Sequence, residues 1–137
     1  MEPEYIFFNQ MTDGRGGLVA LEQNRNIPFE IKRVYYIFGT PENVRRGYHA
    51  HRDLEQVAVC VKGACSFLLD NGKEKVHCRL DLPTTGIYVG NKIWREMYDF
   101  TEDCVLMVLA SELYDEEDYI RDYNHFIEFI NPQKSSS

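Results

Sequence analysis

Short runs of β-forming residues, separated by turn signals, fill this sequence from its N-terminus to about residue 110. Asn71-Gly72, between two such runs, is a strong signal for a tight β-hairpin. Many short strands without intervening helices are typical of a β-sandwich or a small barrel and disfavour a doubly wound α/β fold. The expected strands are residues 5–8, 18–21, 28–38, 47–51, 56–61, 64–69, 74–80, 86–89, 94–100 and 104–110.

The pattern changes near the C-terminus. Apolar residues from residue 120 onward recur at spacings of three and four, which predicts a short helix that begins near Asp115. Asp115 and Asp118 are suited to its first turn, where carboxylates are favourable. We expect one domain over residues 1–137, because this length suits a single core. We expect the polar tail, residues 131–137, to be frayed.

The net charge of −7 comes mostly from one segment. Residues 111–130 contain seven acids and one base. A protein that binds phosphate backbones would carry a basic surface, so nucleic acid is not an expected partner. A small anionic ligand held by a few arginines is compatible with this charge.

The four cysteines, Cys60, Cys65, Cys78 and Cys104, form no CxxC pair and lie among β-forming neighbours. This pattern predicts buried free thiols in a reducing compartment rather than disulfides or a zinc site. The sequence shows neither a secretory signal pattern nor an apolar run long enough for a membrane span. We therefore expect a cytoplasmic protein that does not associate with a membrane.

The stretch RRGYHAHRDLEQVAVCVKG carries the chemistry. His49 and His51 are two residues apart, so on a strand they face the same side, and Glu55 follows. This is half of a metal-binding pattern, which needs a fourth ligand from a later strand. Arg95 stands in that place, and a guanidinium cannot coordinate a cation. We therefore expect no metal, and we interpret the two histidines as a proton-transfer pair.

These residues carry a family resemblance. The segments DGRGGLVALEQ, RRGYHAH, LEQVAVCVKG, LDLPTTGIYVGNKIWREM and VLMVLASELYDEEDYIRDY together resemble the dTDP-4-keto-6-deoxyglucose 3,4-ketoisomerases. The resemblance runs from about Asp13 to about Ile130. It implies a cupin fold, an all-β double-stranded β-helix or jelly-roll barrel, with a short C-terminal helix. The DxRG and RGxH pieces also resemble the dTDP-sugar 3,5-epimerases.

The resemblance implies a metal-independent isomerase without a redox cofactor, serving deoxyamino-sugar biosynthesis for lipopolysaccharide or S-layer glycans. The substrate would be dTDP-4-keto-6-deoxyglucose. A base removes the C3 proton, which is acidic because it lies α to the C4 ketone. The resulting enediol(ate) is reprotonated at C4, so the ketone ends at C3. Matching motifs assign His49 as the base and His51 as the acid or shuttle.

Further site residues follow from the same resemblance. Arg95 and Tyr36 are expected to face the barrel interior and stabilise the enediolate. Arg46, in RGxH, and Arg15, in DxRG, are expected to hold the diphosphate through bidentate guanidinium contacts. Trp94 and Tyr88 either contact the nucleotide-sugar or simply pack, and the sequence favours neither.

The stereochemistry at C4 stays open. Other family members have WHEM where this chain has WREM, so Arg95 departs from part of the family. Arg95 points to the ribo-hexulose product, whereas Arg15 points to the xylo-hexulose branch.

The residues leave three alternatives to the ketoisomerase. A 3,5-epimerase begins with the same proton abstraction, but the second interior histidine, His51, favours the isomerase. A non-catalytic cupin that binds a small ligand is disfavoured by the histidine pair, and a metal dioxygenase is disfavoured by Arg95.

The family resemblance also implies a homodimer. Exchange of the N-terminal strands, residues 1–12, would form it and would bring Arg15 to the neighbouring active site.

Overall fold

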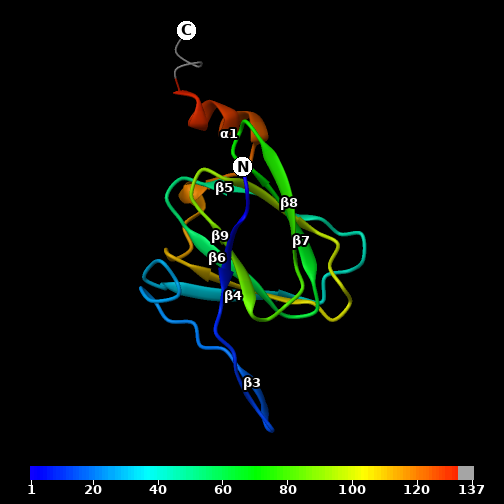
Figure 1. The fold of residues 1–137 in the computed structure, drawn as a ribbon. Helices are drawn as coiled ribbons and strands as arrows, with labels where there is room; N and C mark the ends of the chain where they lie inside the picture. The colour runs from blue at the N-terminus through cyan, green and yellow to red at the C-terminus, as the bar shows by residue number, and fades with distance from the viewer. Residues whose placement is uncertain (133–137) are drawn as a thin grey trace.

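The computed structural model describes residues 1–132, which form two facing β-sheets and one short helix (Figure 1). One sheet has the strand order β1-β9-β6-β11-β4 and the other β12-β5-β10-β7-β8. The strands are β1 (Glu4–Phe7), β2 (Met11–Asp13), β3 (Gly16–Leu18), β4 (Arg33–Phe38), β5 (Arg46–His51), β6 (Gln56–Lys62), β7 (Cys65–Asp70), β8 (Lys75–Leu80), β9 (Thr85–Val89), β10 (Trp94–Tyr98), β11 (Val105–Ala110) and β12 (Tyr119–Ile120). The expected all-β jelly-roll barrel with a short C-terminal helix is confirmed.

The main core lies between the two sheets. Alternate residues of each strand point inward, as the two-residue period of a strand requires. The inward side chains from both sheets include Ala58, Cys60, Phe67, Leu69, Leu80, Ile87, Val89, Met97, Leu106 and Val108. Burial of this apolar surface drives the two sheets together and fixes which face of each strand lines the barrel.

The outer faces of the sheets are covered separately. Residues of the first sheet, among them Val57 and Leu109, pack against Phe8, Ile27 and Phe29 from the N-terminal segment. On the second sheet, Ala50 and Trp94 pack against Ile120 and the helix residue Phe126. Both sheets therefore bury apolar side chains on both faces over part of their area.

The expected C-terminal helix begins later than predicted. The segment that starts at Asp115 forms a 3-10 turn, η1 (Glu116–Asp118), and then β12, which pairs with β5. Helix α1 (Tyr123–Ile130) follows, and its N-cap is Asp122, whose side chain accepts a hydrogen bond from His125 N. Asp115 caps η1 through Glu117 N. Asp115 and Asp118 therefore do lie at the cap and in the first turn of a helical segment, but this segment is η1, and β12 separates it from α1.

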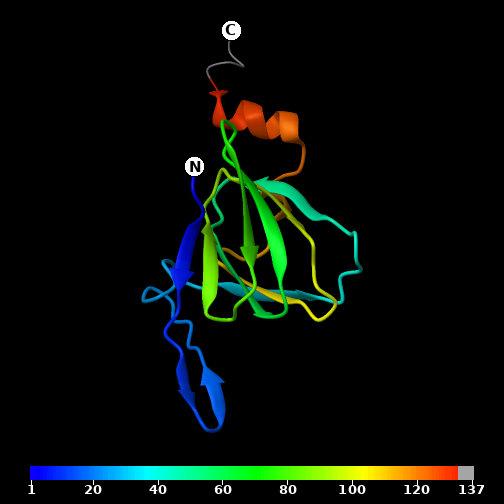
Figure 2. The same cartoon turned by 45° about the vertical axis from the view of Figure 1, so that its right-hand side comes forward.

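The strand expected at residues 18–21 lies earlier in the chain, at residues 16–18, and forms a hairpin with β2. Strands β2 and β3 pair from Met11 with Leu18 to Asp13 with Gly16. Gly16 has φ +118°, a conformation that side-chain-bearing residues rarely adopt. The hairpin extends away from the barrel, at the end of the molecule opposite α1 (Figures 1 and 2).

Three smaller expectations concern the rest of the chain. All four cysteines are buried and free, as predicted. The tail expected to fray, residues 131–137, lies mostly outside the described residues. Among residues 1–132, no helix has the length and apolarity that crossing a membrane would need.

Candidate active site

A bulge in β5 places the first histidine. Gly47 and Tyr48 both have positive φ, +95° and 57°, and the pairing between β5 and β10 shifts between Arg95 and Glu96. A Cβ on Gly47 would lie 2.8 Å from the carbonyl oxygen of Arg95, so only glycine fits there. The bulge restores the register so that His49 pairs directly with Arg95.

His49 and His51 point into the barrel side by side. Their ring centroids are 4.9 Å apart, and the Tyr119 ring lies 5.0 Å from His49 and 4.4 Å from His51. His51 is fully buried. His49 Nδ1 and His51 Nε2 are buried and have no hydrogen-bond partner among the described residues. Each histidine therefore has a ring nitrogen available for proton transfer.

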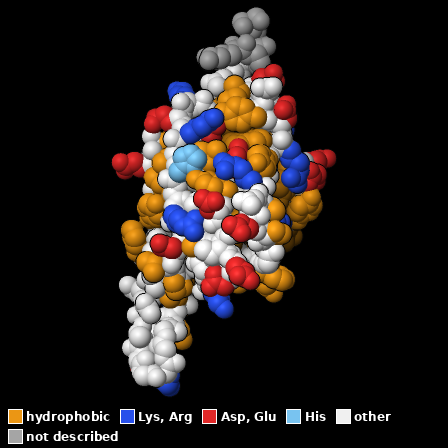
Figure 3. All heavy atoms as spheres, turned by 90° about the vertical axis from the view of Figure 1, so that its right-hand side faces the viewer, with side chains coloured by type: hydrophobic (Ala, Val, Ile, Leu, Met, Phe, Trp, Pro, Cys, Tyr) orange, Lys and Arg blue, Asp and Glu red, His pale blue; other side chains and the backbone are white. Residues whose placement is uncertain are grey.

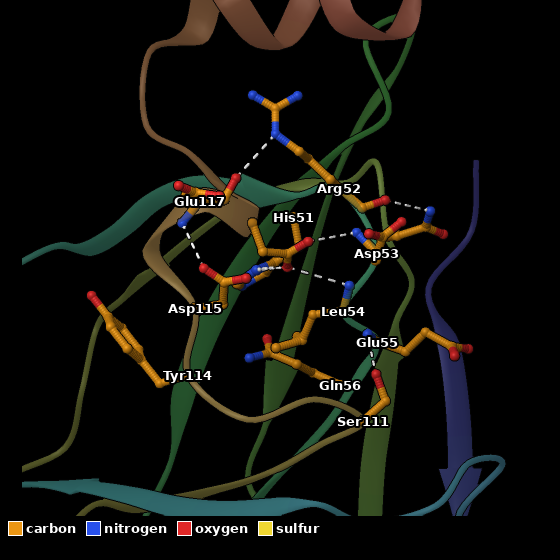
Figure 4. Close-up of polar contacts among 12 residues, drawn as sticks. His51, Arg52, Asp53, Leu54, Glu55, Gln56, Ser111, Tyr114, Asp115 and Glu117 are labelled. Carbon is orange, nitrogen blue, oxygen red and sulfur yellow. Dashed lines mark hydrogen bonds and ion pairs between the residues drawn. The ribbon is translucent and has the colours of Figure 1, made fainter.

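The other nitrogen of His51 has a fixed partner. His51 Nδ1 lies 2.9 Å from Asp118 Oδ2. The same carboxylate accepts hydrogen bonds from Asp53 N at 2.8 Å and from Leu54 N at 3.4 Å. Dashed lines from His51, Asp53 and Leu54 mark these contacts in Figure 4. A neutral His51 donates its Nδ1 proton to Asp118, and its lone pair is then on Nε2.

Both histidines are neutral near pH 7. Burial and, next, the charge of Arg95 lower the pKa of His49 to about 3 and that of His51 to about 2. Arg95 itself stays protonated, although burial lowers its pKa to about 10. Neutral imidazoles can accept a proton, and the fixed positive charge of Arg95 beside them can stabilise an anion.

Arg95 is held in the interior by a chain of hydrogen bonds. It is 1% exposed, and its Nη1 donates to Gln56 Oε1 at 2.6 Å. Gln56 Nε2 in turn donates to the Tyr35 hydroxyl at 3.0 Å. Nη2 donates to the Ile93 carbonyl at 2.8 Å. The expectation that Arg95 faces the interior is confirmed.

A cavity of about 350 Å³ opens at the histidines. His49 lines it, while His51 and Arg95 lie behind its wall. Its lining is basic and aromatic and consists of Arg33, Tyr35, Ile37, Arg46, Gly47, His49, Met97, Tyr119 and Arg121. Arg121 is also paired with Glu116, Nε to Oε1 at 2.6 Å. Three guanidinium groups at the mouth favour an anionic ligand.

Three predicted site residues lie on the outer faces of their strands. Tyr36 is 64% exposed, because on β4 it is Tyr35 that faces the barrel. Trp94 is buried under α1 and its Nε1 donates to Glu96 Oε2, since its neighbour Arg95 occupies the inward position. Tyr88 packs with the outer cluster and donates to Glu55 Oε1. The interior placement of Tyr36 was wrong, and Trp94 and Tyr88 pack away from the histidines.

Arg15 lies far from the histidines of its own chain. It is at the tip of the β2–β3 hairpin, its side chain is 91% exposed, and it pairs with Asp13 at 2.6 Å. Figure 3 shows this projection ending in a basic side chain, well outside the body of the molecule. Arg46, by contrast, lines the cavity beside His49, and its contact with the diphosphate stays a prediction.

Several residues of this site were not predicted from the sequence. Asp118, Tyr119 and Arg121 lie in the segment that was predicted as part of the helix. Arg33 and Tyr35 were not predicted, because Tyr36, on the opposite face of β4, was expected to point inward. Glu55, considered as a metal ligand, accepts a hydrogen bond from Tyr88 on the outer side of the sheet.

Comparison with known proteins matches this geometry to a family. The model of the FdtA family, described as WxcM-like, C-terminal, matches residues 1–131. The chain is 55% identical over 130 residues to a TDP-4-oxo-6-deoxy-alpha-D-glucose-3,4-oxoisomerase of Aneurinibacillus thermoaerophilus, covering 95% of this chain and 94% of that protein.

Solved structures give the same match. A 3,4-ketoisomerase from Helicobacter canadensis has a TM-score of 0.92 at 43% identity, covering 96% of this chain and 98% of that one. A variant of the QdtA 3,4-ketoisomerase from Thermoanaerobacterium thermosaccharolyticum, in complex with TDP-4-keto-6-deoxyglucose, has a TM-score of 0.93 at 44% identity, covering 96% and 95%. The isomerase predicted from the motifs is confirmed, and the chain belongs to the FdtA family of sugar 3,4-ketoisomerases with a cupin-like fold.

Proposed function

We propose that this enzyme converts dTDP-4-keto-6-deoxy-D-glucose to a dTDP-3-keto-6-deoxyhexose. The observation that carries the proposal is a pair of neutral, inward-facing histidines with unpartnered nitrogens beside the buried guanidinium of Arg95. The relative from A. thermoaerophilus and the QdtA complex carry the same substrate in their names, which supports the choice of sugar.

His49 acts as the base, because it lines the cavity while His51 lies behind it. The His49 imidazole removes the proton from C3, and the electron pair moves to the C4 carbonyl oxygen. A proton then passes from O3 to O4. Protonation of C4 leaves the ketone at C3, so the oxidation state is exchanged within the sugar.

His51 serves as the acid or shuttle for the proton that passes from O3 to O4. Its ring centroid lies 4.9 Å from that of His49, and Asp118 fixes the orientation of its imidazole. Arg95 supplies positive charge to the developing enediolate from beneath the pair. Tyr36, on the outer face of β4, has no part in this step. The face of C4 that receives the proton decides between the xylo and ribo products, and Arg95 and Arg15 favour different ones.

Arg46 holds the diphosphate, together with Arg33 and Arg121 from the same cavity lining. A diphosphate carries several acceptor oxygens, and paired guanidinium N–H groups match their geometry. Placing the diphosphate at the mouth directs the sugar inward toward His49.

The enzyme is a homodimer in this proposal. The outer face of β4 exposes Val34, Tyr36 and Phe38 at 52%, 64% and 68%, a patch that a second copy of the chain would cover. Strand β1 pairs with β9 of its own chain, so the projecting β2–β3 hairpin is the segment available to reach a partner. Arg15 at its tip would then approach the partner's diphosphate. Light scattering that gives the 16.1 kDa mass of one chain would contradict the dimer.

We expect the enzyme to work in the cytoplasm, where its free thiols stay reduced.

The substrate class is tested by thermal unfolding with and without TDP. A ligand that binds only the folded state raises the midpoint by mass action. The reaction is tested by incubating the chelator-treated enzyme with dTDP-4-keto-6-deoxyglucose. A 3-keto product supports the proposal, and unchanged substrate contradicts it.

A further inference from the structure

Three of the four buried cysteines converge at a point in the core that the proposed reaction does not use. Cys60 Sγ lies 3.5 Å from Cys65 Sγ and 3.7 Å from Cys104 Sγ. All three sulfurs are within 4.8 Å of one another. The residues come from β6, from the start of β7 and from the loop before β11. We call this group the thiol cluster.

The backbone around the thiol cluster is braced. Thr101 Oγ1 accepts a hydrogen bond from Ala64 N at 2.9 Å, and Thr101 N donates to the Ala64 carbonyl at 2.9 Å. These bonds tie the β6–β7 turn to the loop that carries Cys104. A Cβ on Gly63 would lie 2.4 Å from Thr101 Oγ1, so glycine permits this close approach. The sulfur positions are therefore preorganised by the fold.

The spacing of the sulfurs suits a metal ion. Metal–thiolate bonds of about 2.3 Å place the sulfurs of a three-coordinate site about 4 Å apart. The Sγ–Sγ separations of 3.5 and 3.7 Å approach this value, so the sulfurs accommodate an ion after outward shifts of a few tenths of an ångström. Among residues 1–132, this is the one group of three or more His, Cys, Asp or Glu ligand atoms that are close enough to hold an ion.

The donor set selects the kind of ion. Thiolates are soft ligands that favour Cu(I), zinc or iron–sulfur clusters. Structural zinc needs a fourth ligand, and no further His, Cys, Asp or Glu of the described residues joins the group. We propose that Cys60, Cys65 and Cys104 form a three-coordinate site for one soft, thiophilic cation, Cu(I).

Binding of Cu(I) is coupled to proton release. Each Cu–S bond that forms with one of the three thiols releases the proton of that thiol.

A surface depression borders the core cluster that contains the thiols. It has a volume of about 620 Å³ and is lined by residues 39–42 and 100–102. Phe100 belongs both to this lining and to the core cluster that contains all three thiols.

The site is separate from the catalytic histidines. Cys60 is four residues beyond Gln56 on β6, which corresponds to a distance of about 13 Å along the strand. Cu(I) binding and isomerisation are therefore measured independently, and a failed reaction assay does not decide this proposal.

The test is an anaerobic competition titration of the purified full chain against a chromogenic Cu(I) chelator. We expect the protein to withdraw one Cu(I) per chain, and X-ray absorption at the copper edge to show sulfur ligands only. Cys104→Ala should lower the apparent Cu(I) affinity by at least 100-fold. Cys78→Ala is the matched control, because Cys78 is a buried free cysteine outside the cluster, and it should bind like the unaltered chain.

Three results would overturn the proposal. The first is no withdrawal of Cu(I) by the unaltered chain. The second is nitrogen or oxygen ligation of the copper. The third is an equal loss of affinity in both variants. If instead mild oxidation converts Cys60 and Cys65 to a disulfide in a chain without Cu(I) affinity, the cluster is a redox pair and not a metal site. Thermal unfolding of each variant shows whether a loss of binding follows from a loss of folding.

Discussion

His51 Nδ1 lies 2.9 Å from Asp118 Oδ2, and this contact joins β5 to the segment that precedes α1. The two residues are 67 positions apart in the sequence. The carboxylate also accepts two backbone N–H groups from residues 53 and 54, so its position is fixed independently of the imidazole. Asp118 therefore fixes the orientation of the His51 imidazole without lining the cavity itself. It is a positioning residue.

Asp118→Asn tests this relationship. An amide donates to Nδ1 as well as accepting from it, so it allows the His51 tautomer with the lone pair on the wrong nitrogen. We expect kcat to fall by about 10²–10⁴-fold, with a much smaller change in KM. Steady-state kinetics over a range of pH measure both. Asp115→Asn is the matched control, because Asp115 caps η1 without contacting a histidine. Equal kinetics in both variants would remove Asp118 from the mechanism.

His49→Asn tests the assignment of the base. The variant keeps a polar side chain of similar shape, but this side chain cannot remove the proton from C3. We expect turnover to fall by about 10²–10⁴-fold or more. The rise in unfolding midpoint caused by TDP should remain, because the arginines at the mouth are unchanged. Full activity in this variant would end the assignment of His49 as base.

Arg95→His tests the stereochemical role of the buried guanidinium. Arg95 lies next to both histidines and lowers the pKa of each, so its replacement alters the environment in which C4 is protonated. We expect the ratio of the two C4 epimers to change more than the rate does. The proton coupling at C4 of the product reports the ratio. Arg45→His, which changes an arginine paired with Glu96 instead, should leave the ratio unaltered. An unaltered ratio in the Arg95 variant would refute the steering role.

Arg46→Ala and Arg121→Ala test the diphosphate site. Each removes a guanidinium from the cavity lining. The loss of hydrogen bonds to a charged ligand should weaken TDP binding by about 10-fold to 150-fold in either variant. Isothermal titration measures the dissociation constant. Arg25→Ala, on a loop away from the cavity and paired with Glu22, should bind TDP normally. Normal binding in both cavity variants would place the diphosphate elsewhere.

The buried histidines also predict how stability depends on pH. Burial lowers the pKa of His51 to about 2, whereas an unfolded histidine titrates near 6.5. The unfolded state therefore binds a proton first as the pH falls, and the folded state loses free energy relative to it between pH 6.5 and pH 2. From pH 7 to pH 5, before most carboxylates titrate, His51 contributes a loss of up to about 2 kcal/mol.

Denaturant titrations at pH 7, 6 and 5 test this dependence. His51→Gln should have a shallower decline in unfolding free energy than the unaltered chain, whatever its stability at pH 7. His125→Gln is the control, because His125 is exposed on α1. Identical slopes for the His51 variant and the unaltered chain would show that His51 is already protonated at neutral pH or is accessible to solvent.

Much of this fold was predictable, because runs of β-forming residues between turn signals mark strands directly. These runs predicted β5 to β11 to within two residues, whereas β4 begins at Arg33 and not at residue 28. Asn71-Gly72 predicted the hairpin between β7 and β8. The helix start was not predictable from spacing alone. Residues 115–122 carry both helix-capping acids and the short strand β12, whose pairing with β5 is a tertiary contact.

The site was predicted in part, because some of its residues form local motifs. The HxH spacing and Arg95 were visible as motifs, and both lie inside the barrel. Alternation divides β4 into two faces but does not say which one is inward, and both faces carry aromatic residues, so Tyr36 was chosen instead of Tyr35. The partnership of His51 with Asp118 depends on contacts between segments distant in sequence, which no local pattern encodes.

The most direct test of the reaction is a proton NMR time course of the chelator-treated enzyme with dTDP-4-keto-6-deoxyglucose in D₂O. We expect a 3-keto product with deuterium at C4, because the C3 proton is removed and C4 is reprotonated within the site. Deuterium at C3 and C5 with the ketone still at C4 would contradict it and identify an epimerase. The absence of any exchange would also contradict it.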